Sequence, residues 1–142
     1  TAEQLFAKKS LTYQLTLDGQ KETFEDVIGI VLANGTQWGY DVKAHASASI
    51  TDGWLDVMVV HKFPLIQAGS IVAKMFKGRF QNSRYVKVFQ VKKIIIERES
   101  PGFAQIDGEP MEAGARIEAH IVPASLNLLL PGTLTPEKAA AI

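Results

Sequence analysis

The chain has 142 residues, 46% of them hydrophobic, which suffices for one compact domain with a real core. Its 15 basic and 15 acidic residues give a formal net charge of zero, so no overall field points to nucleic acid as a partner. The longest apolar runs are only strand-sized and cysteine is absent, which excludes a membrane-spanning helix and a disulfide framework.

The N-terminal part predicts a β-hairpin and then a strand buried on both faces. From Leu11 to Leu17, apolar and polar residues alternate with a period of two, which is typical of a strand with one buried face. Asp18-Gly19 predicts a tight turn, because such turns need residues that tolerate positive φ. The partner strand should begin near Lys21 and continue through residues 23–26. Residues 27–33 are so apolar that we expect both of their faces to be covered.

The middle and C-terminal parts predict one helix among several short strands. A loop over residues 34–53 leads to a strand at 54–62. Pro64 suits a first helical turn, and apolar residues recur at helical spacing as far as Gly78, so the main helix is expected at about 64–78. Many short strands around a single helix favour a β-sandwich or a closed barrel over α/β layers. The remaining expected strands are 85–97, 103–106, 116–122 and 125–130, followed by a tail at 132–142.

Three Asp-Gly pairs are candidate polar sites, at residues 18–19, 52–53 and 107–108. The first is interpreted as a turn alone. Glu109 follows the third pair, so two carboxylates are separated by one residue and would lie on the same side of an extended backbone. One of them could accept a proton from a hydroxyl while the other binds a metal or orients the first. A plain hairpin turn is the other interpretation of the Asp-Gly-Glu sequence.

The second Asp-Gly pair is a candidate metal site. The carboxylate of Asp52 could join nearby carbonyl oxygens around a hard cation such as Mg²⁺, and a turn without metal is the alternative. His45, His61 and His120 are too scattered to predict a transition-metal site. No Gly-rich phosphate loop is present, so this sequence has no visible nucleotide-binding motif.

Positive charge is concentrated in one segment. No Asp or Glu occurs between Val57 and Ile96, where eight lysines and arginines fall. This segment is either a solvated face balanced by acidic loops elsewhere in the fold, or a surface that faces anionic headgroups. For the second case, the candidates for a peripheral membrane contact are Lys74, Lys77, Arg79 and Arg84, with Phe76 and Phe80 among them.

Five short motifs, taken in order, carry a resemblance to a known family. They are Ala33-Asn34-Gly35, Asp52-Gly53-Trp54-Leu55-Asp56-Val57, Lys77-Gly78-Arg79, Ile106-Asp107-Gly108-Glu109 and Val122-Pro123-Ala124-Ser125-Leu126. This series resembles the carboxy-terminal part of bacterial diacylglycerol kinase-like lipid kinases, whose superfamily also contains sphingosine, ceramide and NAD kinases. The resemblance covers roughly Leu11 to Pro131, and it depends on the order and spacing of the motifs.

The resemblance implies a two-sheet, β-sandwich-like domain over residues 1–131. In the family this domain closes over a cleft opposite a Rossmann-like nucleotide-binding domain, which is absent from this chain. ATP is then the co-substrate, Mg²⁺ the cofactor, and a lipid hydroxyl such as that of diacylglycerol the acceptor.

The resemblance also implies roles for single residues. Asp107 matches the general base and Glu109 its partnering acid. Asp52 matches a structural Mg²⁺ ligand, joined by the backbone carbonyls of Ser49 and Trp54. Asp56, in the same motif, is assigned to packing or hydrogen bonding.

The sequence departs from the family pattern in two places. Gly39 is followed by Tyr40 and Asp41, where members often have further glycines. Ala46-Ser47-Ala48 stands where a Pro-x-Ala sequence is familiar. Both departures bear on the loop conformation and the substrate more than on the fold.

The sequence therefore predicts part of an ATP-dependent lipid kinase, cytoplasmic and peripheral at the membrane. We expect the chain alone to be inactive, because its ATP site would lie in the other domain. The architecture also allows a homodimer through an exposed sheet edge. The alternative is a non-catalytic β-sandwich module that binds a lipid or a protein. A kinase for a soluble acceptor such as NAD is a third hypothesis.

Overall fold

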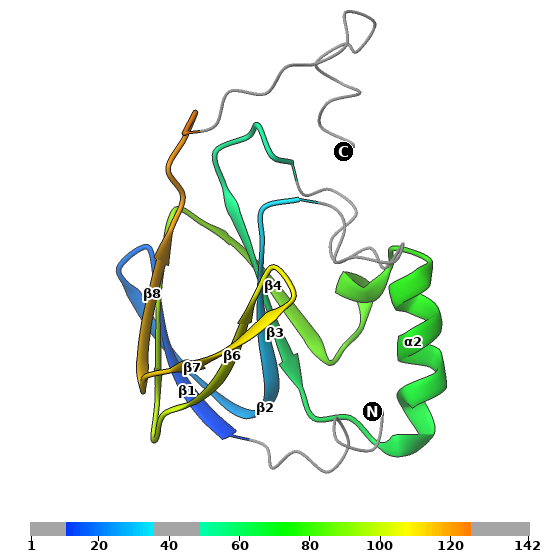
Figure 1. Ribbon diagram of the computed structural model, residues 1–142. Coiled ribbons are helices and arrows are strands. Elements are labelled where there is room, and N and C mark those ends of the chain that lie inside the picture. Colours follow the sequence, from blue (N-terminus) through cyan, green and yellow to red (C-terminus); the bar gives the residue numbers. More distant parts are fainter. Residues whose placement is uncertain (1–10, 36–48, 126–142) are drawn as a thin grey trace, which may run out of the picture.

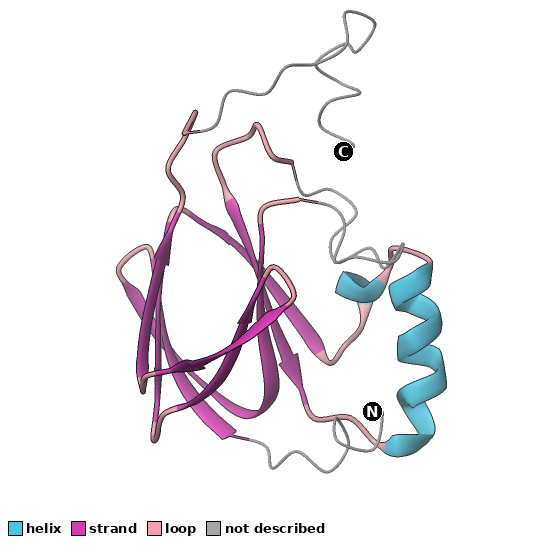
Figure 2. Cartoon of the chain, in the orientation of Figure 1, coloured by secondary structure: helices cyan, strands magenta, loops and turns pink. Residues whose placement is uncertain are grey.

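The computed structural model describes residues 11–35 and 49–125, which form a mainly β fold with one α-helix (Figures 1 and 2). Within these residues, the six-stranded antiparallel sheet has the order β4-β3-β2-β1-β5-β8, and β6 and β7 form a separate hairpin. The predicted mainly β fold with two sheets is therefore confirmed, and no closed barrel forms in the described part. The strands are β1 (Leu11–Leu17), β2 (Gln20–Ala33), β3 (Leu55–His61), β4 (Val86–Val91), β5 (Lys93–Arg98), β6 (Gly102–Ile106), β7 (Glu109–Ala113) and β8 (Arg116–His120).

The first hairpin forms as the sequence predicts. Asp18 and Gly19 turn the chain with φ values of 47° and 92°, and Leu17 pairs with Gln20. β2 is one strand of 14 residues that includes both predicted segments. Its pairing with β3 shifts register between Val27 and Gly29, next to Asp26, whose φ is 54°. Such a bulge bends a strand and increases its twist.

The six-stranded sheet has a packed core on each of its faces. One core is centred on Leu15, Val57 and Ile94, all fully buried. The other holds Met58 together with Ile71 of α2. Neighbouring residues of β3 thus point to opposite cores, as the period of a strand requires. The apolar run at 27–33 contributes side chains to both, which confirms the expectation that its two faces are covered.

The predicted helix is confirmed in a shorter form. A 3₁₀ turn, η1 (Leu65–Gln67), runs directly into α2 (Ala68–Phe76), and a second 3₁₀ turn, η2 (Phe80–Asn82), follows. The helix ends where Gly78 takes a φ of 62°, a left-handed conformation that glycine adopts without strain. Among the described residues, no helix is both long and apolar enough to cross a membrane.

One strand prediction was wrong, and one strand was not predicted. The strand expected over residues 85–97 is two strands, because the chain bends at Lys92 between β4, which pairs with β3, and β5, which pairs with β1. β7 was missed because its sequence, Glu-Pro-Met-Glu-Ala, is poor in β-forming residues. Pro110 is tolerated there because both strands of a two-stranded sheet are edges. The tail at 132–142 and nearly all of the expected strand at 125–130 lie outside the described residues.

The β6–β7 hairpin and α2 lie on opposite sides of the curved six-stranded sheet (Figure 1). The hairpin crosses the side of the sheet that faces away from α2, and α2 lies beside β3 and β4. β4 and β8 are the outer strands of the six-stranded sheet.

Candidate functional site

The acid pair predicted from the sequence lies at the tip of the β6–β7 hairpin. Ile106 pairs with Glu109, so Asp107 and Gly108 form a two-residue turn. Their φ values are 48° and 94°, the conformation of a primed hairpin turn, which Asp and Gly tolerate. The Gln105 side-chain amide donates to the Gly108 carbonyl at 2.8 Å and supports the turn from one side.

Asp107 and Glu109 are both exposed and line the same open pocket. Its volume is about 340 Å³, and its other lining residues are Ile106, Pro110 and Met111. Within the described residues, no hydrogen bond or ion pair engages either carboxylate. The arrangement offers two acceptor groups beside an apolar wall. It can accept a proton from a hydroxyl whose apolar remainder lies against that wall.

The Asp52 turn has the features of an oxygen-rich cation site. Asp52 Oδ1 accepts a hydrogen bond from the Trp54 amide at 2.9 Å, and Gly53 turns the chain with a φ of 75°. Ser49 Oγ accepts a hydrogen bond from the Thr51 amide at 3.3 Å. The turn therefore presents one carboxylate and several carbonyls, which are the donors that Mg²⁺ prefers. Among the described residues, no group of three or more His, Cys, Asp or Glu side chains is arranged to hold a metal.

The Asp52 turn and the Asp107 turn lie at separate places. Figure 1 shows the loop before β3 apart from the β6–β7 tip. The sequence predicted a structural role for Asp52 and a chemical role for Asp107, and their separation is compatible with that division. Asp56, by contrast, is almost fully buried in β3, in agreement with a packing or hydrogen-bonding role.

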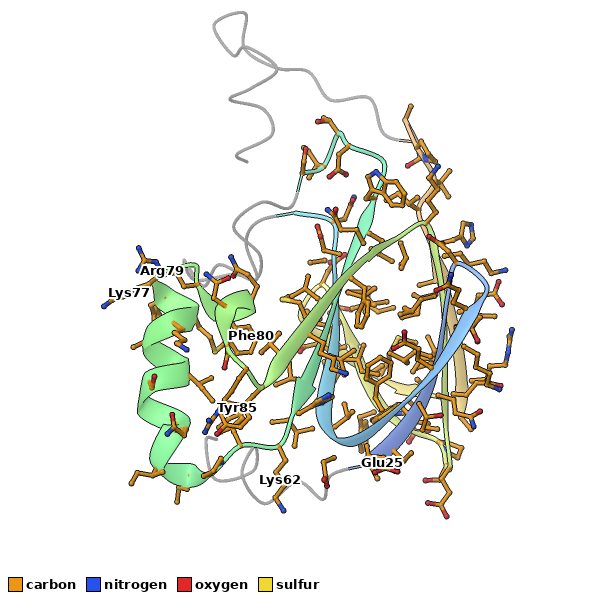
Figure 3. The ribbon with its side chains drawn as sticks, turned by 180° about the vertical axis from the view of Figure 1, so that it is seen from behind. Glu25, Lys62, Lys77, Arg79, Phe80 and Tyr85 are labelled. Carbon is orange, nitrogen blue, oxygen red and sulfur yellow. The ribbon has the colours of Figure 1, made fainter. Side chains whose placement is uncertain are left out.

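The acid-free segment forms α2 and its surroundings. The helix buries Ile71 against the sheet but exposes Phe76, which is 61% accessible. In η1, directly before the helix, Leu65 and Ile66 are 70% and 89% accessible. Lys77 and Arg79 point away from the sheet at the end of the helix, whereas Phe80 lies between helix and sheet (Figure 3).

Two of the other basic side chains predicted for this surface have different surroundings. Arg84 donates to the Tyr85 hydroxyl at 2.6 Å, and its guanidinium lies over the Tyr85 ring. Lys74 is half-buried. Both are therefore less available to a ligand than Lys77 and Arg79.

His61, at the end of β3, is a structural histidine. Its burial lowers its pKa, the nearby Lys87 lowers it further, and Asp26 acts in the opposite direction. Its ring lies 6.1 Å from that of Phe24, centroid to centroid. His120 is exposed on β8, and His45 lies outside the described residues.

Sequence reasoning missed Arg98, whose guanidinium binds main-chain carbonyls at the base of the β6–β7 hairpin. In the sequence it stands between Glu97 and Glu99 and has the appearance of an ordinary surface charge. The contact joins residues that a turn brings together, so no local pattern could have indicated it.

A family model described as the YegS C-terminal NAD kinase beta sandwich-like domain matches residues 1–130. A search of curated proteins found no match.

The solved structures with a similar fold include three from Bacillus anthracis str. Sterne. Two structures of a candidate diacylglycerol kinase superpose with TM-scores of 0.59 and 0.62, each at 21% sequence identity. They cover 83% and 85% of this chain, but only 43% and 41% of their own. A structure of a diacylglycerol kinase superposes with a TM-score of 0.58 at 20% identity and covers 87% of this chain and 47% of its own. This chain thus spans less than half the length of the structures it resembles.

Proposed function

Because this chain belongs to the YegS C-terminal NAD kinase beta sandwich-like domain family, we propose that it is the acceptor-side domain of an ATP-dependent lipid kinase. The enzyme transfers the γ-phosphoryl group of ATP to a lipid hydroxyl, with diacylglycerol as the first candidate. The single observation that supports this proposal most is the pair of exposed carboxylates, Asp107 and Glu109, in a pocket with an apolar wall.

Asp107 is the proposed general base. The lipid hydroxyl oxygen forms a bond to the γ-phosphorus while the bond from phosphorus to the β–γ bridging oxygen breaks, and ADP leaves with that electron pair. The hydroxyl proton passes to the Asp107 carboxylate, which is open to solvent and pocket. Glu109, two residues on, orients the acceptor or shares a cation. Ile106 and Met111 hold the apolar part of the acceptor.

Asp52 is the proposed Mg²⁺ ligand, with the backbone carbonyls of Ser49 and Trp54. A hard cation there would neutralise the carboxylate and stabilise the turn before β3. One Asp52 oxygen already fixes the turn by accepting from the Trp54 amide, so the other is the one offered to a metal.

The decisive experiment is an assay of the intact protein that carries this chain, with γ-labelled ATP and a panel of lipid alcohols. We expect label in diacylglycerol or a similar lipid, and none when the 142-residue chain is assayed alone. Label in NAD but in no lipid would establish the soluble-acceptor hypothesis instead. Label in neither acceptor would favour the non-catalytic binding module.

Contact with a membrane accompanies this proposal, because a bilayer lipid must be reached at its surface. Leu65, in the 3₁₀ turn η1 directly before α2, is exposed. Val72 and Phe76 are four residues apart on α2, so they share one face of the helix, and both are exposed as well. Lys77 and Arg79 follow directly, and no acidic residue lies in this segment. Exposed apolar residues beside basic ones are typical of a helix that lies in the interface of an anionic membrane.

Vesicle co-sedimentation tests the membrane contact. The Lys77→Gln, Arg79→Gln double variant should bind vesicles rich in phosphatidylglycerol several-fold more weakly, and Phe76→Ser should weaken binding to neutral and anionic vesicles alike. Lys21→Gln, a change at an exposed lysine on β2, is the matched control. Equal binding by wild type, the Lys77→Gln, Arg79→Gln variant and the Phe76→Ser variant would contradict the contact. Such a protein remains cytoplasmic but peripheral at the membrane in this proposal.

A further inference from the structure

Arg98 joins the two strands of the β6–β7 hairpin at its base. Its Nη2 donates to the carbonyls of Gly102 and Ala113, at 2.9 and 2.7 Å. These two residues face each other as the pair that closes the hairpin. Nη2 also lies 3.0 Å from the Gly114 carbonyl, and Nε donates to the same oxygen at 3.2 Å. One guanidinium thus connects β5 with the first residue of β6 and the last residue of β7.

The hairpin has few other attachments. No residue from Gly102 to Ala113 is buried, so its side chains are not anchored in either core of the six-stranded sheet. An isolated two-stranded sheet is at best marginally stable in water. The direction in which the hairpin projects from the sheet therefore depends on its base, where Arg98 lies.

Gly102 leaves room for the Arg98 guanidinium because it has no side chain. A Cβ atom added at Gly102 would meet Arg98 Nη1 at 3.2 Å and Cζ at 3.5 Å, which is tighter than ordinary packing. The guanidinium lies flat against the space that glycine leaves free. A methyl group at this position would press on the guanidinium and shift it by a few tenths of an ångström relative to the carbonyls.

The donors of Arg98 are directed to neutral main-chain oxygens. Its fifth contact, from Nη1 to the Phe103 carbonyl at 3.5 Å, is also to the backbone. Among the described residues, no carboxylate pairs with it. A planar fork of N–H groups fixes geometry in a way that a lysine ammonium does not. Arg98 therefore acts on the orientation of the hairpin, and its donors are not open to a substrate phosphate.

We propose that Arg98 is a positioning residue that sets the direction of the hairpin and thereby the location of Asp107 and Glu109. The proposal rests on the kinase function proposed above. The five residues of β6, Gly102–Ile106, lead from Arg98's contact to the turn over about 17 Å at the usual rise of a strand. A tilt of about 10° at the base would move the tip by about 3 Å over this length. Misplacement of about 1 Å at a reacting centre can reduce a rate by about 100-fold.

The test measures amide hydrogen exchange and steady-state kinetics in the intact protein that carries this chain. In Arg98→Ala we expect faster exchange at residues 102–113 and unchanged exchange in β1 and β2. We also expect kcat to fall about 10- to 100-fold, while KM for ATP stays the same. Arg98→Lys, which keeps the charge but offers fewer and less directed donors, should restore only part of kcat. Gly102→Ala, which shifts the guanidinium slightly without removing it, should change exchange and kcat in the same direction as Arg98→Ala but by less.

Arg116→Ala is the matched control, because Arg116 is an exposed arginine on the neighbouring β8 that pairs with Glu118. It should leave both exchange and kcat at wild-type values. Unchanged exchange in both Arg98→Ala and Gly102→Ala would overturn the proposal, and so would faster exchange with wild-type kcat. If the wild-type protein phosphorylates no acceptor, the kinase function fails. The exchange rates then still decide whether Arg98 fixes the hairpin.

Discussion

The Asp18-Gly19 and Asp107-Gly108 turns have the same sequence and nearly the same backbone, yet their carboxylates have different surroundings. The φ values are 47° and 92° in the first turn and 48° and 94° in the second. Both turns join antiparallel strands through two residues. The dipeptide thus determines the turn in the same way at both places.

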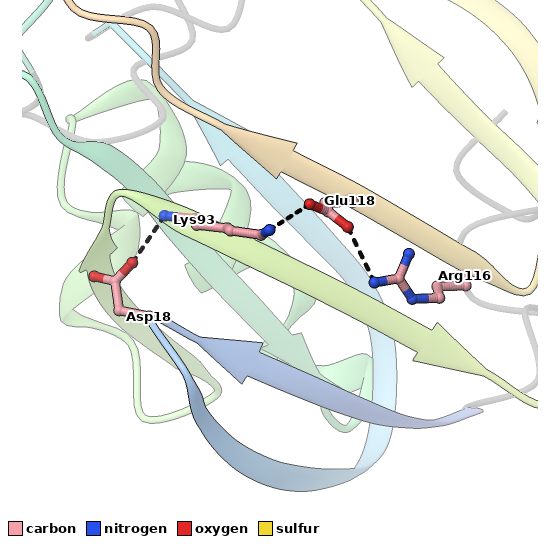
Figure 4. Close-up of polar contacts among 4 residues, drawn as sticks. All are labelled: Asp18, Lys93, Arg116 and Glu118. Carbon is pink, nitrogen blue, oxygen red and sulfur yellow. Dashed lines mark hydrogen bonds and ion pairs between the residues drawn. The ribbon is translucent and has the colours of Figure 1, made fainter.

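The difference is in what lies opposite each carboxylate. Asp18 accepts hydrogen bonds from the Lys92 and Lys93 amides, with distances of 2.8 to 3.1 Å, and so connects the first hairpin to the junction of β4 and β5. Figure 4 shows the Lys93 contact and the ion pairs that continue from Lys93 to β8. Asp107 instead borders an open pocket. The Asp18 carboxylate therefore stabilises the fold through backbone hydrogen bonds, whereas the Asp107 carboxylate faces the pocket.

The largest effect is expected for Asp107→Asn. Asparagine tolerates the left-handed backbone of the turn, so the hairpin should survive while the proposed base is lost. If Asp107 is the general base, kcat of the intact kinase should fall about 100- to 10,000-fold. The melting temperature should stay at the wild-type value because no described residue bonds this carboxylate. A variant that keeps most of its turnover would contradict the assignment of the base.

Asp18→Asn makes the same change in the other turn and should have the opposite outcome. The neutral amide loses the charge that strengthens two backbone hydrogen bonds, and the free energy of unfolding should fall by about 1 to 2 kcal/mol. Activity per folded molecule should be unchanged. Urea denaturation of both variants, measured side by side, checks the contrast. Equal loss of stability in the two would mean that the turns do not differ in the way described.

Sequence patterns predicted the fold well wherever they reported on local structure. The alternation in β1, the Asp-Gly turn after it and the doubly covered run at 27–33 all formed as expected. The expected strand 85–97 was wrong because the bend at Lys92 is stabilised by Asp18, more than 70 residues away in sequence. A contact of that range has no local signal.

The sequence indicated which residues form the candidate site but not which residues support it. The Asp-Gly-Glu sequence indicated the acid pair, and the structure brings both carboxylates to one pocket. The hairpin that carries them was only half predicted, since β7 lacks strand character. Arg98 could not be inferred, because its partners are main-chain carbonyls, which every residue has.

The Asp52-Gly53 pair offers an intermediate case. In Asp52→Ala, the turn loses the hydrogen bond from the Trp54 amide, at a cost of about 0.5 to 1.5 kcal/mol. If Asp52 also holds Mg²⁺, the wild-type protein should melt at a higher temperature with Mg²⁺ than with a chelator, and this difference should disappear in the variant. Asp18→Asn is the control and should keep the difference. Melting of the wild type that does not respond to Mg²⁺ would count against the metal role.

The smallest effect concerns Glu118, which extends the network of the Asp18 turn. Hydrogen bonds from Lys93 and then Arg116 lower the pKa of Glu118 below its ordinary value. A carboxyl group whose pKa is lower in the folded state than in the unfolded chain adds stability at pH above the unfolded value. That stability is lost as the pH falls through the folded value.

Glu118→Gln should therefore be slightly less stable than wild type at neutral pH and equal to it in strong acid. Because the ion pairs are exposed, the difference should be small and should shrink further in high salt. Urea midpoints of both proteins, measured from neutral pH down to about pH 2.5, would show their stabilities becoming equal. Glu112→Gln, at an exposed glutamate of β7, should run parallel to wild type at every pH. If Glu118→Gln also ran parallel, the ion pairs next to Asp18 would contribute nothing, and the stabilising role of that turn would depend on its backbone hydrogen bonds alone.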